Sequence, residues 1–251
     1  MSEEKSLEDK TLEVGQIYTS GKYLKQHPTW HAEDSPWKAE QIRKVLERNQ
    51  LHPNSICEVG CGAGEILNQL YLQMPNNVSF IGYEISEDAF NLCQPKKKER
   101  LDFKFENILE DENAFFDLVL AMDVVEHVDD YLGFLRGLSE KGMYNIFHLP
   151  LDISVQAILR HSVPILNMRE RSGHLHYFTK ETALETLKDT GYEILDYFYT
   201  PSAFKPSSKQ TPLSTLAKWP RRIMYALNED MAVRTLGGYS LMVLAQKNKK
   251  E

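Results

Sequence analysis

The stretch that decides the fold reads Ile56-Cys57-Glu58-Val59-Gly60-Cys61-Gly62-Ala63-Gly64-Glu65. Its first half is typical of a short buried strand, and its second half is a glycine-rich turn that leads into a helix. Glycines at alternate positions let the backbone approach a ligand closely, because no Cβ stands in the way. In α/β folds such a strand-turn-helix unit holds nucleotide-like ligands. The stretch therefore predicts a ligand site at the carboxyl end of the first strand.

Strands and helices alternate along the chain on both sides of this stretch. Apolar or alternating runs predict strands at 55–59, 78–83, 101–105, 116–122, 143–149, 194–199 and 239–245. Helical patterns follow most of them, including a helix that Thr179 caps and Gly191 ends. This alternation predicts an α/β fold with a parallel, doubly wound sheet.

The N-terminal part is expected to differ from the rest. Residues 1–37 form a lead-in with an aromatic-rich segment, and 38–251 form the main domain. Asp34, placed before Ser35 and Pro36, predicts a helix start with a capping side chain. The aromatic segment either docks that helix on the sheet edge or closes over a ligand pocket.

The alternation loosens after Pro150. We expect a helix over 153–159 and an irregular, Arg-rich connection over 160–173. An insertion at about 201–236 is expected to cap the pocket, and its residues 201–222 contain five basic and no acidic side chains. The alternative is a solvated surface loop. A basic cap suggests an acidic or phosphorylated ligand, and an amphipathic one would permit peripheral membrane contact.

Bulk composition narrows the class of protein. The chain has 251 residues, of which 42% are hydrophobic and 26% charged, as in ordinary soluble domains. A formal charge of −7 argues against a general nucleic-acid binder. No apolar run reaches membrane-spanning length, and the charge-rich start lacks a signal core, so a cytoplasmic location is expected. Cys57 and Cys61 are expected to be buried fillers.

The residue after the glycine turn helps to choose between cofactors. A dinucleotide fingerprint would have its third glycine at position 65, where this chain has Glu65. That carboxylate would repel the pyrophosphate of an NAD-type ligand. S-adenosylmethionine has a zwitterionic amino-acid end and no phosphate, so it tolerates this position better.

With its other motifs, the chain resembles the class I S-adenosylmethionine-dependent methyltransferases, and within them the ubiquinone-biosynthesis-like small-molecule groups. The matching motifs are Glu58 to Gly64, Tyr83-Glu84, Asn107-Ile108, Asp123 to Val128 and His174 to Thr179. The resemblance covers roughly residues 40–200. It implies a Rossmann-like, seven-stranded, mostly parallel sheet with an antiparallel last strand, an N-terminal helical segment and a cap insertion.

The resemblance also implies a set of donor-binding residues. Glu84 would accept hydrogen bonds from both ribose hydroxyls, as a carboxylate can. Asn107 would bond the adenine edge with Ile108 against its face, while Met122 and Asp123 would border the sulfonium. The full expected set is Glu58, Gly60, Cys61, Gly62, Gly64, Glu84, Ile85, Asn107, Ile108, Met122 and Asp123.

Methyl transfer to a hydroxyl requires that its proton be removed, and histidine suits this near neutral pH. The candidates are His127, His174 and His176. Each has a structural alternative; His127 could cap a helix, and His174 and His176 would project to the same side of an extended segment.

A metal site is a further hypothesis. Asp123, Glu126 and His127 have the acidic-x-x-Glu-His spacing found in some metal-dependent methyltransferases, with His176 or His174 as a fourth ligand. Such an ion would acidify two adjacent hydroxyls of an acceptor. A divalent metal is nevertheless not the expectation, because relatives with the same signature often have none assigned.

The sequence thus predicts a methyltransferase acting on a small-molecule acceptor, at a hydroxyl oxygen, as a monomer or homodimer. One alternative is a donor-binding regulatory module without catalysis. Another is a nucleotide-cofactor oxidoreductase, which Glu65 disfavours.

Overall fold

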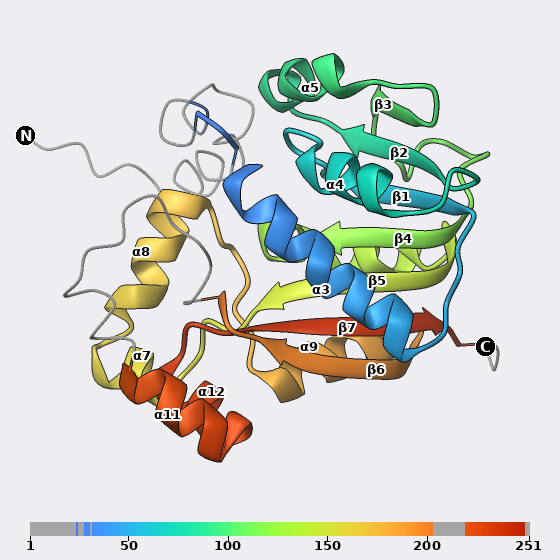
Figure 1. The fold of residues 1–251 in the computed structure, drawn as a ribbon. Coiled ribbons are helices and arrows are strands. Elements are labelled where there is room, and N and C mark those ends of the chain that lie inside the picture. The colour runs from blue at the N-terminus through green and yellow to red at the C-terminus, as the bar shows by residue number, and fades with distance from the viewer. Residues whose placement is uncertain (1–23, 25–27, 31, 203–218, 249–251) are drawn as a thin grey trace, which may run out of the picture.

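A computed structural model describes Leu24 and residues 28–30, 32–202 and 219–248. Within these residues, one sheet has the strand order β3-β2-β1-β4-β5-β7-β6 (Figure 1). Strands β1 to β5 run parallel, and β7 is antiparallel to both of its neighbours. The strands are β1 (Ser55–Val59), β2 (Ser79–Glu84), β3 (Leu101–Phe105), β4 (Phe116–Met122), β5 (Gly142–Pro150), β6 (Tyr192–Thr200) and β7 (Ser240–Lys247). The expected Rossmann-like sheet with an antiparallel last strand is confirmed.

Helices cover both faces of the sheet and create two cores. Ile42 of α3 and Leu67 of α4 pack in one core, while Leu135 of α6 and Leu187 of α9 pack in the other. Apolar cover on both faces explains why β1 and β4 are almost continuously apolar. The helices are α3 (Ser35–Arg48), α4 (Glu65–Gln73), α5 (Glu87–Cys93), α6 (Tyr131–Leu138), α7 (Val155–Leu159), α8 (Val163–Ser172), α9 (Lys180–Asp189), α11 (Trp219–Leu227) and α12 (Glu229–Leu236). Short 3-10 turns are η2 (Ala32–Asp34), η3 (Gln94–Lys96) and η4 (Val125–His127).

Two local predictions were wrong. The connection expected to be irregular contains helix α8, with Pro164 in its first turn and Gly173 ending it at a φ of 72°. Only Ile165 of this helix is buried, so its apolar pattern was too weak to be recognised. Asp34 begins α3 but makes no capping hydrogen bond. Its helical backbone angles, within η2, do not give the extended geometry that a capping side chain needs.

The second half of the chain builds a lobe where the parallel strands end. Helices α7, α8, α11 and α12 lie together on the side toward which β4 and β5 point (Figure 1). Of the expected cap over 201–236, α11 and α12 are described, while 203–218 lie outside the described residues. Most of the N-terminal aromatic segment lies outside them too. None of the described helices combines the length and apolarity needed to cross a bilayer.

Candidate active site

The glycine turn after β1 has the strained backbone that its sequence indicated. Gly60, Gly62 and Gly64 have φ values of 61°, 55° and 71°, a region that residues with a Cβ rarely adopt. A Cβ on Gly64 would lie 2.5 Å from the Phe103 ring, so close packing also requires glycine there. A Cβ on Gly62 would lie 2.6 Å from the Trp30 indole. Trp30 therefore lies directly against the turn and forms one wall of the site.

Glu84, at the end of β2, has its carboxylate fixed by backbone amides. One oxygen accepts a hydrogen bond from Gly62 N at 2.8 Å, and the other accepts from Ile85 N and Ser86 N at 2.9 and 2.8 Å. Burial raises the pKa of Glu84, although the three N–H donors oppose that rise. The carboxylate is thus oriented before any ligand arrives, with lone pairs left for hydroxyl groups.

Glu58, within β1, is buried beneath the same turn. Its pKa rises to about 8 through burial, with Lys38 opposing the rise and Glu84 adding to it. Its Oε2 has no hydrogen-bond partner among the described residues. At neutral pH this carboxyl group is therefore largely protonated in the folded chain.

A buried polar chain crosses the ends of β4, β5 and β6. Asp123, whose φ is 58°, accepts from Lys38 Nζ at 2.8 Å and also bonds His148 Nδ1. His148 Nε2 lies 2.8 Å from the Thr200 hydroxyl. Burial lowers the pKa of Lys38, but the adjacent Asp123 more than offsets this, so the net shift is upward. The Asp123 carboxylate is thus held by residues of two other elements.

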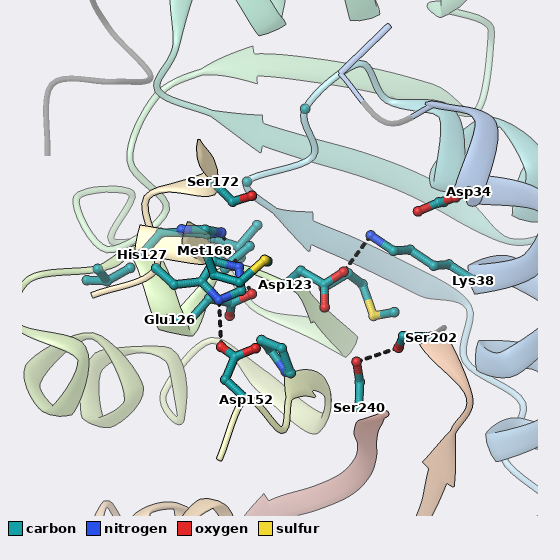
Figure 2. Close-up of a pocket in the computed structure, with 18 of the residues that line it drawn as sticks. Asp34, Lys38, Asp123, Glu126, His127, Asp152, Met168, Ser172, Ser202 and Ser240 are labelled. Carbon is teal, nitrogen blue, oxygen red and sulfur yellow. Dashed lines mark hydrogen bonds and ion pairs between the residues drawn. The ribbon is translucent and has the colours of Figure 1, made fainter. Parts of the chain in front are cut away.

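A second cluster lies beside this chain and combines Glu126, His127 and His174 (Figure 2). One potential ligand atom from each residue can be chosen so that all three lie within 4.8 Å of one another. The backbone brings them together, because the Glu126 carbonyl accepts hydrogen bonds from Leu175 N and His176 N. Residues 48 positions apart therefore meet above the end of β4 through main-chain contacts.

Each histidine of this cluster has its Nδ1 fixed by an acceptor. His127 Nδ1 lies 3.1 Å from the Gly173 carbonyl, and His174 Nδ1 lies 2.7 Å from Asp152 Oδ2. Donation from each Nδ1 makes Nε2 the nitrogen that carries the lone pair in the neutral ring. Burial is the main reason that the pKa of His127 falls to about 4, so its ring is neutral at pH 7. Metal-bound histidines characteristically have such an acceptor on the other ring nitrogen.

Glu126 is fully buried, and neither of its carboxylate oxygens has a hydrogen-bond partner among the described residues. Its nearest ion-pair contact is His127 Nε2 at 3.7 Å. Burial, reinforced by Asp123, raises the pKa of Glu126 well above its ordinary range. Buried polar atoms normally have partners, so an orphaned carboxylate facing two imidazole nitrogens fits a metal ion.

One cavity of about 1140 Å³ joins these groups. It is lined by ten of the eleven predicted donor residues; Gly64 is outside the lining and serves packing against Phe103 instead. Among the catalytic candidates, His127 and His174 line the cavity. His176 does not, because its Nε2 bonds the Val128 carbonyl at 2.9 Å and its ring packs on Tyr131.

Sequence reasoning missed several residues of the site. Lys38 lines the cavity from α3, and His148 supports Asp123 from β5. Trp30, which also lines the cavity, belongs to the aromatic segment for which closing over a pocket was one expectation. Asp152 was also missed, although it follows β5 at the sheet edge where ligands bind. A polar residue at each strand's carboxyl end was the available signal for His148 and Asp152.

Comparisons with known proteins agree with this geometry. Residues 30–197 match the model of a family described as a methyltransferase domain. A comparison with curated protein sequences found no match. Among solved structures, magnesium protoporphyrin IX methyltransferase from Synechocystis PCC 6803 with bound SAH is similar at a TM-score of 0.55 and 13% identity, over 99% of this chain and 90% of that one.

Two further structures show how widely this fold is used. The cyclopropane synthase MmaA2 from Mycobacterium tuberculosis has a TM-score of 0.54 and 15% identity, over 77% of this chain and 78% of that one. The [4+2]-cyclase SpnF has a TM-score of 0.55 and 17% identity, over 84% and 81%. At these identities the likeness establishes the fold alone.

Proposed function

We propose that this chain methylates a hydroxyl oxygen of a small-molecule acceptor. The chain belongs to the methyltransferase domain family and is a class I S-adenosylmethionine-dependent enzyme. One observation carries the proposal: the glycine turn with Glu84 and the cluster of Glu126, His127 and His174 line the same cavity. The first group suits the donor, and the second suits an oxygen that must lose a proton.

The chain's contribution to the donor would be positioning. Glu84, fixed by three amides, would accept from the ribose hydroxyls, and Trp30 would cover the turn. Asn107 and Ile108 line the cavity where the adenine is expected. The donor supplies an activated methyl group on a sulfonium. Aligning it with the acceptor oxygen therefore provides most of the catalysis.

At the acceptor, Glu126, His127 and His174 fit a divalent ion. Two imidazole nitrogens and one carboxylate suit Zn²⁺, Fe²⁺ or Mn²⁺ better than the all-oxygen preference of Mg²⁺. When bound, such an ion would lower the pKa of a coordinated hydroxyl. Gly173 and Asp152 would hold the two rings through Nδ1, so that Nε2 is the nitrogen that carries the lone pair. The sequence left a divalent metal possible but not expected, and we favour the metal hypothesis with Glu126, His127 and His174 as ligands.

A metal-free variant of the same function rests on the Asp152–His174 pair. With Asp152 on Nδ1, the His174 Nε2 would accept the hydroxyl proton as a general base. Chelation separates the two versions. Full activity after removal of metal with a chelator would favour His174 alone, whereas loss of activity that Zn²⁺ or Mn²⁺ restores would favour the ion.

The donor assignment is tested by thermal shift with S-adenosylhomocysteine and with NADH. We expect stabilisation by S-adenosylhomocysteine alone; stabilisation by NADH alone would favour the oxidoreductase alternative. A screen of vicinal-diol acceptors that monitors S-adenosylhomocysteine release then tests transfer to oxygen. Donor binding without turnover on any acceptor would favour a regulatory module.

A further inference from the structure

The acidic and the basic residues that line the cavity come mostly from different parts of the sequence. Its lining contains ten acidic residues, and every one of them lies at or before Asp152. From Ser154 onward the described lining has no carboxylate, but it contains Arg160 and Arg221. The lining contributed by residues up to Asp152 is therefore acidic, which suits a sulfonium and a metal ion, whereas the lining from Ser154 onward is basic. This contrast is notable in a chain with a formal net charge of −7.

The described lining has three basic side chains, Lys38, Arg160 and Arg221, and they differ in whether a carboxylate lies beside them. Lys38 is paired with Asp123 at 2.8 Å. Among the described residues, no carboxylate lies within ion-pair distance of Arg160 or Arg221. Residues 201–222 also contain no acidic side chain in the sequence. The positive charge of the two arginines is therefore not neutralised by these parts of the chain.

Gln156 contacts both of the segments that carry the two arginines. Arg160 ends α7 and its backbone N–H donates to the Gln156 carbonyl. Arg221, in the first turns of α11, donates from Nη2 to Gln156 Oε1 at 3.0 Å and to the Leu236 carbonyl at 3.1 Å. These neutral acceptors orient the Arg221 guanidinium through Nε and Nη2. Its two Nη1 donors have no described acceptor, so they remain for a ligand.

We propose that Arg160 and Arg221 bind an anionic group of the methyl acceptor, a phosphate or a carboxylate, while its hydroxyl lies at the cluster of Glu126, His127 and His174. This assignment rests on the proposed function. The planar guanidinium group of each arginine matches the geometry of both anions. The acceptor is thus a hydroxylated acid or phosphate ester.

The test is calorimetric titration of the full chain saturated with S-adenosylhomocysteine. The phosphate arm uses inorganic phosphate and pyrophosphate. The carboxylate arm compares 3,4-dihydroxybenzoate with the uncharged 3,4-dihydroxybenzamide. We expect at least one anion to bind, and we expect Arg160→Gln and Arg221→Gln each to weaken its binding about tenfold or more. Binding in one arm alone identifies which anion the acceptor carries.

The controls separate this inference from the proposed function. Arg171→Gln alters an exposed arginine of α8 outside the cavity lining and should leave anion affinity unchanged. S-adenosylhomocysteine affinity should be unchanged in every variant, which also reports that Arg221→Gln folds. Loss of donor binding in the unmodified protein would refute the proposed function. Intact donor binding, with no anion bound or with Arg160→Gln binding anions normally, would overturn the inference alone.

Discussion

Two buried carboxylates, one in each half of the cavity, differ in the hydrogen bonds that the described residues donate to them. Glu84 in the donor half accepts three backbone hydrogen bonds. Glu126 in the acceptor half accepts none from any described residue. The donor half therefore orients Glu84 without a ligand, because its own backbone supplies three donors to that carboxylate. The acceptor half leaves a carboxylate unsatisfied, which is costly unless an ion or substrate supplies the partner.

The largest expected effect is the loss of stability when Gly64, in the donor half, is replaced. A matched substitution at Gly191 separates backbone strain from crowding. Gly64→Ala should destabilise the protein by about 2–5 kcal/mol, since it adds left-handed strain and forces a Cβ against Phe103. Gly191 has a φ of 91° but no atom within 4 Å of an added Cβ, so Gly191→Ala should cost only about 1–2 kcal/mol. Urea unfolding measures both, and equal losses would show that packing at the turn contributes nothing.

The next largest effect is a loss of donor affinity when Glu84, the carboxylate held by three backbone amides, is replaced. Glu84→Gln should weaken S-adenosylhomocysteine binding by about 1.5–3 kcal/mol, because charge-assisted hydrogen bonds to the ligand are lost. Glu87→Gln, three residues away on an exposed position of α5, is the matched control and should bind normally. Calorimetric titration gives both affinities. Unchanged affinity in Glu84→Gln would remove this residue from the donor site.

The last effect is the pH dependence of stability, which is the smallest when it is expressed per pH unit. The pKa of Glu58 is raised to about 8 in the folded chain, so between its unfolded value near 4.5 and about 8 the folded state holds the extra proton. Stability must then fall as pH rises through this window, by up to about 1.4 kcal/mol per unit. Glu58→Gln should flatten the slope in melting curves recorded without donor. An unaltered slope would mean that Glu58 is ionised in the folded protein.

The donor half was also the half that the sequence could predict. Its strands are short apolar runs, and the glycines at 60, 62 and 64 specify their own backbone angles, so local rules suffice. The seven strands were predicted to within a few residues for this reason.

The acceptor half depends on contacts between distant residues. The cluster required residues 126 and 174 to meet through main-chain hydrogen bonds, which no local pattern encodes. His174 and His176 were expected on one side of an extended segment, yet they bond Asp152 and the Val128 carbonyl respectively. The contact of Arg221 with Gln156, 65 positions earlier in the chain, was hidden for the same reason.

The most direct test of the two-half account measures both ligands on both variants. Calorimetry would follow S-adenosylhomocysteine and Zn²⁺ or Mn²⁺ binding to the unmodified protein, Glu84→Gln and Glu126→Gln. The account predicts that Glu84→Gln loses donor affinity and keeps the metal, while Glu126→Gln loses the metal and keeps the donor. Metal binding that survives in Glu126→Gln, or is absent from the unmodified protein, would contradict it.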